Sequence, residues 1–438
     1  MKKKKLSPRK PELNVGYVPI DSLKENPHNA RTHSEKQIRK IMKSINKFGF
    51  VNPVLVDQNK MIIAGHGRIR SAKELEITEV PVIFVEHLSP EEVRAYLIMD
   101  NKSALEAGWD EDMLKIEFQY FMDLDFDFDV TLTGFEVPEI DFIVNDINKK
   151  ETKPDKADIL PDENKVPKRV NAGDLWKLGN HYLYCGDSLK EESYKILLGD
   201  QKANMVLADD PYNVPINHHV CGNGRIKHSE FAMASGEMSS VQFIDFLERI
   251  FRNCAKHSTD GSWHLHFMDW KHSFEILTAG NKVYTELKNI IVWDKINAGM
   301  GSMWRSQHEL IFAFKNGTAP HVNNIELGKH GRHRSNIWSY PGVSATNPRS
   351  LEDLKLHPTV KNTNMIMEAL LDCSKPNDIA LDCFVGSGTT LLAAERTHRK
   401  AYCIEYEPKY CDVVIYRYEK LFNKKVEFIG NYKEDSNV

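Results

Sequence analysis

The chain has 438 residues, of which 41% are hydrophobic and 27% are charged, as in globular proteins that are soluble in water. Because one ordinary hydrophobic core does not extend over so many residues, the length predicts two or three domains. No apolar run approaches the roughly 20 residues that cross a bilayer, so we expect no contact with a membrane. The net charge of −4 excludes attraction to nucleic acid through overall charge, but not through a local basic groove.

The cysteines indicate neither a disulfide framework nor a zinc site. There are seven of them, an odd number, and no two stand in a Cys-x-x-Cys pair. The histidines form no group with the spacing of metal ligands, so we expect no metal. The lysines at 2–5 are followed by no apolar stretch, unlike those of a secretory signal. These features favour a protein of the reducing cytoplasm.

Short strands and helices are mixed in the first part of the chain. Strands are predicted over residues 15–20, 53–56, 61–64 and 80–85. Helices are predicted to begin at Ser34, Gly65 and Pro90, and the helix after Ser34 has its isoleucines at helical spacing. This pattern predicts a small α+β domain over residues 12–147.

Residues 148–168 are rich in Lys, Asp, Glu and Pro and poor in apolar side chains. A segment of this composition cannot bury itself, which predicts a linker. It separates the first domain from a second one over residues 169–432.

Apolar runs alternate regularly with helical patterns in the second domain. The runs are His181–Tyr184, Met205–Ala208, Trp263–Met268, Ile290–Trp293, Leu310–Phe314, Ile379–Phe384 and Ala401–Ile404. Helical patterns such as those over 241–254 and 364–373 lie between them. The alternation predicts a doubly wound α/β sheet, whose ligands bind at the carboxyl ends of the strands.

A motif in the first domain resembles that of a known family. GHGRIRSA over 65–72 resembles the G-[EH]-x-R-x-x-A box of ParB-like nuclease or partition domains, and NARTH over 29–33 resembles their upstream N-x-R segment. The pocket residues that this resemblance implies are Arg31, Gly65, His66 and Arg68. Glycines before a helix N-terminus, together with arginines, can hold a phosphate.

The sequence leaves the role of this pocket open between binding a nucleotide, binding DNA and docking. Surface ion pairing is the simpler explanation of Arg68 and Arg70. The related sulfiredoxins need a nucleophilic cysteine, and none precedes Cys185, so their chemistry is excluded.

A glycine turn in the second domain predicts a nucleoside site. Gly386 and Gly388 follow a strand and open a helix, and they let the backbone approach a ligand. Glu405 ends the next strand about 20 residues further on, where an acid hydrogen-bonds ribose hydroxyls. NAD is disfavoured because Leu391 replaces the third glycine of its motif, and a P-loop because GK[ST] is absent. The alternative is a tight turn without a ligand.

Several motifs of this domain resemble those of the amino-group DNA methyltransferases. DCFVGSGTT over 382–390 resembles their FxGxG motif, and HPTVK over 357–361 resembles the HPT-x-K element that precedes it in the permuted β-group. GDLW at 173–176 and CGDS at 185–188 resemble the first strand of the family. The resemblance covers roughly residues 169–425, and Asn362 departs from the proline usual after HPT-x-K.

This resemblance implies a permuted Rossmann-like sheet that binds S-adenosylmethionine, behind a smaller α+β ParB-like domain. Asp187 is expected near the adenine of the cofactor, Glu405 on its ribose and Lys361 at its methionine part. The implied cofactor residues are Asp187, His357, Thr359, Lys361, Asp382, Phe384, Gly386, Gly388, Thr389 and Glu405.

An apolar strand ends in Asp209-Asp210-Pro211-Tyr212, which resembles the catalytic Asp-Pro-Pro-Tyr motif of the family. An exocyclic amine attacks a methyl sulfonium poorly, because its lone pair is delocalised into the ring. An acceptor such as Asp209, with a nearby backbone carbonyl, favours the pyramidal nitrogen that can attack. Pro211 stiffens the turn, and Tyr212 offers a face on which an extruded base stacks.

Asp210 replaces the first proline of the motif. It keeps the backbone carbonyl, but it removes a fixed φ and is expected to add a charge near the reacting amine. The acid at 209 favours adenine N6 over cytosine N4 as the target. The alternatives are a weakened or silent enzyme that only binds DNA, and a methyltransferase that acts on RNA.

Residues 215–345 are expected to contain an insertion that reads the target sequence, as in this family. Glycines in the loop over 218–227 suit closure on a flipped base. The expected DNA contacts, unless this basic run is only a solvated loop, are Lys329, Arg332 and Arg334 to phosphates and Asn336 to a base edge.

The segment over 297–309 also resembles a segment of the family. Its His308 and Glu309 are equally compatible with structural and catalytic roles. DNA is the expected partner, and a homodimer is left open.

Overall fold

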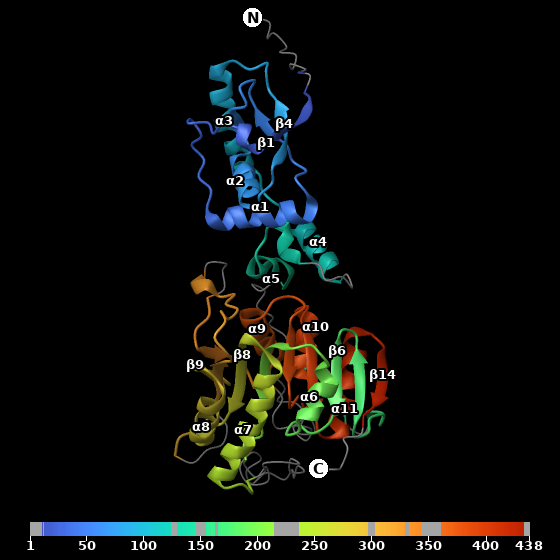
Figure 1. Ribbon diagram of the computed structural model, residues 1–438. Helices are drawn as coiled ribbons and strands as arrows, with labels where there is room; N and C mark the ends of the chain where they lie inside the picture. The colour runs from blue at the N-terminus through green and yellow to red at the C-terminus, as the bar shows by residue number, and fades with distance from the viewer. Residues whose placement is uncertain are drawn as a thin grey trace, which may run out of the picture. The chain divides into compact units, whose positions relative to one another are not determined.

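The computed structural model describes residues 11, 13–123, 129–145, 155–162, 165–213, 236–296, 303–328, 333–342 and 361–432. The chain forms two compact units (Figure 1). The first unit comprises residues 1–121 and 126–136, and the second unit comprises 122–125 and 137–438. Within the described ranges, no helix is both long enough and apolar enough to span a membrane.

The first unit contains a four-stranded sheet with the order β1-β4-β2-β3. Its strands are β1 (Val15–Pro19), β2 (Val54–Val56), β3 (Ile62–Ala64) and β4 (Glu79–Phe84). Its helices are α1 (Glu35–Phe48), α2 (His66–Glu74), α3 (Pro90–Glu106) and α4 (Glu111–Asp123), with 3-10 turns at Ile20–Ser22 and Val130–Thr133. The sheet packs against Ile69 and Ala72 of α2. The predicted α+β class of this part is confirmed.

Two helices of the first unit begin at capping residues. Ser34 accepts a hydrogen bond from the backbone N of Gln37 at the start of α1, as the sequence predicts. Ser89 and Glu92 form a reciprocal capping box at the start of α3.

The second unit contains a ten-stranded sheet in its described part, with the order β11-β9-β10-β8-β7-β12-β13-β6-β5-β14. The strands are β5 (Asp174–Leu178), β6 (His181–Cys185), β7 (Ala203–Asp209), β8 (Ser258–Met268), β9 (Glu286–Asp294), β10 (His308–Lys315), β11 (Ile337–Ser339), β12 (Ile379–Asp382), β13 (Lys400–Glu405) and β14 (Val426–Asn431). The neighbouring strands β8, β7, β12, β13 and β6 run parallel. Both margins are mainly antiparallel.

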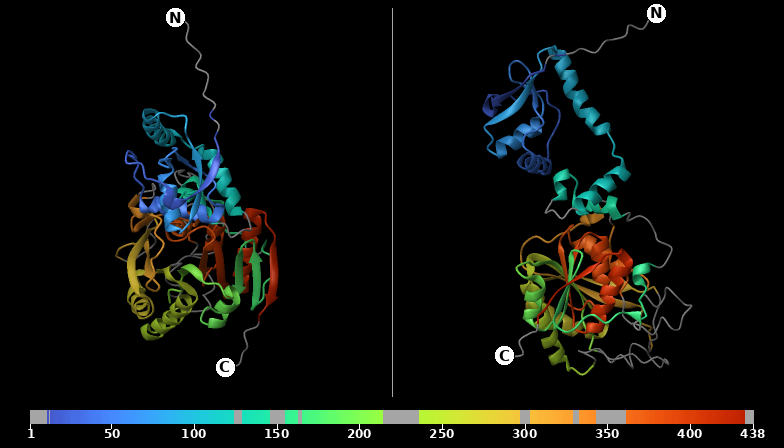
Figure 2. Two further views of the ribbon diagram at one scale, coloured as in Figure 1. Left: turned by 45° about the horizontal axis from the view of Figure 1, so that its top comes forward. Right: turned by 90° about the vertical axis from the view of Figure 1, so that its right-hand side faces the viewer.

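Helices cover both faces of this sheet, which the right-hand view of Figure 2 shows nearly edge-on. One face, called the α7 face here, carries α6 (Glu191–Leu198), α7 (Ser240–Lys256) and α8 (Ser273–Val283). The opposite face, called the α10 face, carries α9 (Thr363–Cys373), α10 (Thr389–Arg396) and α11 (Pro408–Phe422). Because the sheet is covered on both sides, the middle of β7 is buried and reads as a continuous apolar run. The predicted doubly wound α/β architecture is confirmed.

A buried ion pair holds α5 (Val137–Asn145) within the second unit. The Asp141 carboxylate accepts hydrogen bonds at 2.7 and 2.8 Å from both terminal nitrogens of Arg399, and the two side chains are 2% and 0% exposed. The short helix Lys156–Asp158 also packs here, because Asp158 accepts hydrogen bonds from the backbone N and the hydroxyl of Thr363 at 2.9 and 2.6 Å. These segments fall within the predicted first domain and linker, whose limits stay a prediction.

Much of the range predicted to contain the insertion builds the sheet itself. α7, β8, α8, β9 and β10 all lie within residues 240–315. A 3-10 turn at Trp270–His272 separates β8 from α8, and another at Glu326–Gly328 follows β10. An insertion within residues 215–345 that reads a target stays a prediction.

Candidate active site

Three acidic side chains end three neighbouring strands. Asp209 ends β7, Asp382 ends β12 and Glu405 ends β13. β12 pairs in parallel with both other strands, with Leu381 opposite Val206 and Asp382 opposite Cys403. The three acids therefore lie along one edge of the sheet, called the carboxyl edge here. The sheet thus brings together the predicted catalytic segment and the predicted glycine turn, which are far apart in the sequence.

The glycine turn is tied to the end of β13 through the carboxylate of Glu405. Its Oε2 accepts a hydrogen bond from Gly386 N and its Oε1 from Glu407 N, both at 2.9 Å. Asp382 Oδ1 accepts one from Phe384 N at 3.0 Å. Burial raises the pKa of both Asp382 and Glu405 to about 7. Each of these carboxyl groups is therefore poised to gain or lose a proton near neutral pH.

The two glycines of the turn serve different purposes. Gly388 is the N-cap of α10 with φ +93°, and a Cβ there would lie 3.0 Å from both γ-carbons of Val414 on α11. Gly386 has φ +53° but faces open space, with no heavy atom nearer than 4.0 Å to an added Cβ. The packing of α10 on α11 therefore requires the second glycine, and only the first is free to let a ligand approach.

The predicted cofactor residues beside the turn occupy different environments. Thr389 is buried at the start of α10, and Phe384 is half-buried against the α7 face. Asp187 follows β6, the neighbour of β13, and its carboxylate accepts a hydrogen bond from Leu189 N at 2.9 Å. His357 and Thr359 lie outside the described residues.

Lys361, predicted to contact the methionine part of the cofactor, lies beside Asp209, the predicted catalytic residue. Its ammonium is 2.8 Å from Asp209 Oδ1, 3.0 Å from Glu309 Oε2 and 3.2 Å from the hydroxyl of Tyr212. Lys295 forms a second ion pair with Glu309. Two ammonium groups and two carboxylates thus form a compact cluster, in which the aromatic rings of Tyr212, Phe267 and Trp293 lie 5.0–5.5 Å from the Lys361 ammonium.

The two carboxylates of this cluster differ in their proton affinity. Burial raises the pKa of Asp209, although the ammonium of Lys361 opposes the shift. Burial acts in the same direction on Glu309, but Lys361 and Lys295 outweigh it, and the pKa of Glu309 is lowered. Glu309 is therefore a lasting anion, whereas Asp209 is the more basic acceptor.

One oxygen of Asp209 is free for a substrate. Oδ1 receives the ammonium of Lys361 and, at 2.9 Å, the hydroxyl of Tyr212. No hydrogen bond to Oδ2 occurs among the residues that the structure describes, and the side chain is 26% exposed. Asp209 can therefore accept a hydrogen bond from an incoming N–H group without losing the contacts that orient it.

Asn213 ends the catalytic turn with φ +52°. Its side-chain oxygen accepts hydrogen bonds from Gly236 N and Met238 N, and its nitrogen donates to Met238 O. The side-chain amide of Asn213 thus joins the residue before the segment 214–235 to the residues directly after it. The predicted closing loop over 218–227 lies outside the described residues.

The expectation that Asp210 adds a charge near the reacting amine is wrong. Successive side chains of a strand point to opposite faces, so residue 210 points away from the side that carries Asp209 and Lys361. The Asp210 carboxylate lies on the α7 face, where Oδ2 is 2.8 Å from His266 Nδ1. Both side chains are 0% exposed.

The predicted DNA contact of Arg334 is also corrected. Its Nε donates to Asp372 on α9 and its Nη1 to the hydroxyl of Tyr340, both at 2.9 Å, and the side chain is 15% exposed. Its guanidinium also stacks on Trp338, 4.8 Å from the ring centre. These contacts make Arg334 a structural residue.

The other predicted DNA contacts have different outcomes. Asn336 is exposed, and its side chain bonds to Asn289 Oδ1 and Ile290 O on β9 at 3.4 and 3.3 Å. Lys329 and Arg332 lie outside the described residues.

Two arginines of the pocket predicted in the first unit bond to backbone carbonyls of that unit. Arg31 donates to Asn101 O at 3.0 Å, and Arg68 donates to the backbone carbonyls of Asn52 and Pro53 at 2.6 and 2.9 Å. Burial lowers the pKa of Arg68. The explanation by surface ion pairing therefore does not hold for Arg68.

The neighbouring residues of that motif have separate roles. Arg70 does pair with acids, namely Glu35 and Glu74. Gly65 takes φ +108° at the start of α2. Burial is the main cause of the lowered pKa of His66.

Sequence reasoning missed one residue of the site, Lys295, because it carried no signal beyond its place after an apolar strand. Glu309 was found in a motif that resembles the family, but its role was left open between structural and catalytic. In the antiparallel pairing of β9 with β10, Glu309 lies opposite Trp293, and Lys295 follows Trp293 by two residues. Their proximity depends on strand register, which the sequence does not state.

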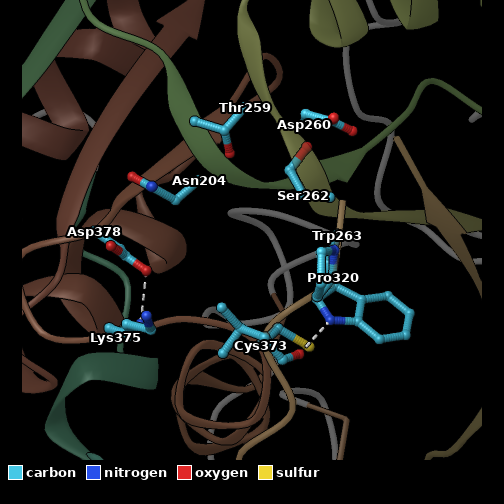
Figure 3. A pocket seen from close by; sticks show the side chains of 11 residues that line it. Asn204, Thr259, Asp260, Ser262, Trp263, Pro320, Cys373, Lys375 and Asp378 are labelled. Carbon is cyan, nitrogen blue, oxygen red and sulfur yellow. Dashed lines mark hydrogen bonds between the residues drawn. The ribbon is translucent and has the colours of Figure 1, made fainter. Parts of the chain in front are cut away.

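A pocket with a volume of about 110 Å³ lies away from this site (Figure 3). It is lined by Asn204 at the start of β7, by Ser262 and Trp263 in the first half of β8, and by Lys375 and Asp378 before β12. In a parallel sheet these positions mark the amino ends of the strands. The pocket is therefore at the edge opposite the acids.

Three family models match the chain. The DNA methylase model of the N6/N4 methyltransferases matches residues 203–416, and the ParB N-terminal domain model matches residues 5–101. A model of the ParB-methyltransferase HTH domain matches residues 112–169, a region that the sequence reasoning did not separate. The chain therefore combines an N6/N4 amino-group DNA methyltransferase domain with an N-terminal ParB-like domain. Both resemblances predicted from the sequence are confirmed.

Individual proteins resemble one part of the chain each. The ParB-like nuclease domain-containing protein YnaK of Escherichia coli (strain K12) is 44% identical over 81 residues, 18% of this chain and 93% of YnaK. The type II methyltransferase M.HinfI of Haemophilus influenzae is 24% identical over 234 residues, 49% of this chain and 62% of M.HinfI. The solved structure of the cytosine-N4-specific PvuII DNA methyltransferase covers 58% of this chain and 94% of its own, with 18% identity and a TM-score of 0.43.

The carboxyl edge fits S-adenosylmethionine, the cofactor of this family. The Glu405 carboxylate ends β13 in the position that accepts hydrogen bonds from ribose hydroxyls, and Gly386 leaves open space beside it. The free oxygen of Asp209 lies at the end of a strand adjacent to β12, from which the glycine turn departs. The predicted cofactor is confirmed.

Proposed function

We propose that the protein methylates the exocyclic N6 amine of adenine at specific sites in DNA. The observation that carries this proposal is the geometry of Asp209, which keeps one oxygen free at the edge where the glycine turn lies. A carboxylate there accepts a hydrogen bond from the amine, and its negative charge stabilises the positive charge that develops on nitrogen.

The residues of the chain bind and orient the base and the cofactor. The bound cofactor supplies an electrophilic methyl group. Asp209 orients the amine and accepts the proton that nitrogen loses, and the carbonyl of Asp210 accepts the second N–H. Tyr212 stacks on the extruded base, and Glu405 holds the ribose of the cofactor. Glu309 keeps Lys361 charged, so that Asp209 is oriented from its other oxygen.

Adenine is preferred over cytosine because of the acid at position 209. A full carboxylate suits the N6 amine, and cytosine-N4 enzymes more often carry a serine at this position. The position of Asp210 favours an active enzyme over a silent DNA binder, because its charge is directed away from the reacting amine.

Labelled methyl transfer from S-adenosylmethionine to unmethylated DNA, followed by modified-base sequencing, tests this proposal. We expect N6-methyladenine within one recognition sequence, and a loss of about 100-fold to 1,000-fold in kcat for Asp209→Ala, as for other groups that stabilise charge in a transition state. Asp260→Asn is the matched control, since Asp260 lies near the opposite end of β8 and is expected to keep full activity.

Three outcomes would contradict parts of the proposal. N4-methylcytosine would overturn the choice of base alone. Preferential labelling of RNA in a competition with duplex DNA would overturn the choice of polymer. No transfer to any DNA tested would overturn the activity itself.

DNA recognition by the rest of the chain completes the proposal. The helix-turn-helix match over 112–169 supports a second contact with DNA, because such motifs place a helix in the major groove. Phosphate-bearing ligands, either a nucleotide or DNA, are assigned to the first unit.

A further inference from the structure

A chain of buried hydrogen bonds leads away from the catalytic turn on the α7 face. Asp210 Oδ2 lies 2.8 Å from His266 Nδ1, and His266 Nε2 lies 2.9 Å from the hydroxyl of Tyr284. The same hydroxyl is 3.1 Å from His264 Nδ1, whose Nε2 is 3.1 Å from Ser262 Oγ. None of these side chains contributes to the mechanism described above.

The surroundings of this chain are apolar and closed. The ring of Phe251 on α7 packs 4.2 Å from the ring of His266, and Tyr284 stacks against Phe314. The groups near Asp210 from other elements are His266, the hydroxyl of Tyr284 and the thiol of Cys383, which in turn lies 3.9 Å from the thiol of Cys254. No lysine or arginine is paired with Asp210 in the part of the chain that the structure describes.

The hydrogen bonds along this chain can all run in one direction, and only the other oxygen of Asp210, Oδ1, is buried without a partner among these groups. Ser262 donates to His264 Nε2, His264 Nδ1–H donates to Tyr284, Tyr284 donates to His266 Nε2, and His266 Nδ1–H donates to the Asp210 carboxylate. Both histidines are then neutral, which agrees with the burial that lowers the pKa of His264. If Asp210 is protonated, every donor and acceptor exchanges its role. The link between Asp210 and His266 therefore exists in either protonation state.

The strand pairing gives this link a mechanical consequence. His266 is opposite Ala208 in the parallel pair of β7 and β8, so the link joins the two strands next to the catalytic turn. Asp209 and Asp210 share one peptide unit, and their side chains point to opposite faces. Fastening residue 210 on the α7 face therefore restrains the carboxylate of Asp209 and the carbonyl of Asp210 on the catalytic side.

We propose that the Asp210–His266 hydrogen bond is a positioning device that replaces the rigid proline usual at position 210. A proline fixes the turn through its ring, which holds φ near −65°. Here a side chain does so through a buried tether to the neighbouring strand. Asp210 and His266 are positioning residues, and the proposal rests on amine methylation as the proposed function.

Three substitutions at position 210 separate the tether from other effects. Asp210→Ala removes the tether and leaves φ unrestrained, so kcat is expected to fall by about 10-fold to 100-fold, as for a misplaced catalytic group. Asp210→Asn keeps an oxygen that accepts from His266 Nδ1–H, and Asp210→Pro restrains φ directly. Both are expected to recover most of that loss, while the affinity for S-adenosylmethionine changes by less than about threefold. An alanine variant as active as the parent, or an asparagine variant no better than alanine, would overturn the proposal.

Matching substitutions on β8 test the other end of the tether. His266→Leu removes the donor and is expected to lower kcat as Asp210→Ala does, whereas His266→Asn puts an amide donor near the position of Nδ1 and recovers activity. In the Asp210→Pro background the leucine change is expected to alter kcat by less than about threefold. His264→Leu is the control, because it removes an equally buried histidine from the same face of β8 without touching Asp210. Equal losses of kcat for His264→Leu and His266→Leu would mean a general packing effect and contradict the tether.

A measurement without catalysis keeps this proposal separate from the proposed function. Urea unfolding of Asp210→Ala, His266→Leu and the double variant gives the coupling between the two side chains. A parent that transfers no methyl group would refute the proposed function, and the unfolding cycle would then decide about the tether. If the loss of unfolding free energy in the double variant equals the sum of the two single losses, the tether is overturned. A loss smaller than that sum would support the tether. An inert parent that gains activity through Asp210→Pro would also overturn it, because the tether would then have failed to replace proline.

Discussion

Glu405 and Asp382 make the stability of the protein without cofactor depend on pH. Burial raises the pKa of both to about 7, from ordinary values of 4.5 and 3.8. Between these values the folded protein binds more protons than the unfolded chain, so the free energy of unfolding falls as pH rises through this interval. We expect urea unfolding to show a more stable protein at pH 5.5 than at pH 8.

Glu405→Gln supplies the control for this pH dependence. The amide does not titrate, so the variant is expected to lose part of the decline in stability between pH 5 and 8. Ribose hydroxyls that donate to Glu405 favour its charged form, so cofactor binding should release a proton near pH 7. Calorimetric titration in buffers with different ionisation enthalpies measures that release. Uptake of protons would contradict the assignment of Glu405 to the ribose.

Glu309 is expected to tune the catalytic acid through its charge. Its negative charge raises the pKa of Asp209, so Glu309→Gln lowers that pKa. Asp209 then keeps its charge to lower pH, and the acid limb of the profile of kcat/KM against pH should move to lower pH. Glu286→Gln is the control, because Glu286 begins β9 at the end of that strand that lies away from Glu309. A shift of the acid limb to higher pH would show that the Glu309 charge does not act on Asp209.

At the residue scale, the sequence predicts which residues belong to the site better than it predicts where their side chains point. Asp209, Glu405 and the glycines were found because their types and spacing follow from the chemistry. The direction of the Asp210 side chain was also open to prediction, since neighbouring strand residues alternate between faces. The partners of Lys361 and Arg334 were not, because each depends on a residue brought near only by the fold.

At the element scale, the glycine turn yields a prediction about packing. Gly388→Ala forces a Cβ against Val414 at a positive φ, and we expect a loss of about 2 kcal/mol or more in the free energy of unfolding. Gly386→Ala meets no neighbouring atom, so only the positive φ costs about 1 kcal/mol. Urea unfolding compares the two losses, and titration with S-adenosylmethionine compares their affinities. Equal losses of stability would mean that α10 and α11 can move apart at little cost.

Helices and strands were predictable where a hydrophobic pattern within the segment itself indicates them. β7, β12 and β13 are buried on both faces, so each appears as an unbroken apolar run. The antiparallel margin of β9 and β10 has the same apolar runs, and only its pairing shows that residues 240–315 belong to the sheet. Register and strand order are long-range properties, which local periodicity does not contain.

At the scale of the whole molecule, the ion pair between Asp141 and Arg399 predicts where the second unit can be separated. A fragment of residues 137–438 keeps both partners, whereas a fragment of 148–438 leaves the Arg399 guanidinium buried without its carboxylate. An unpaired buried charge costs about 3–5 kcal/mol, so we expect the shorter fragment to unfold at lower urea concentration or to aggregate. Expression of both fragments and urea unfolding measure the difference.

Asp141→Ala in the longer fragment is the control for that comparison. It removes the carboxylate without removing α5, and it should account for most of the difference between the fragments. Two fragments of equal stability would show that α5 is not needed by the second unit, in agreement with the predicted first domain that ends at residue 147.

The side chain of Asn213 also links two segments of the chain. A single amide joins both flanks of residues 214–235 next to the catalytic turn. The backbone at 213 and at 236–238 is therefore fixed by one and the same side chain. Replacing Asn213 by alanine would release both places at once, so the turn beside Asp209 and the segment that leads into α7 would lose their order together.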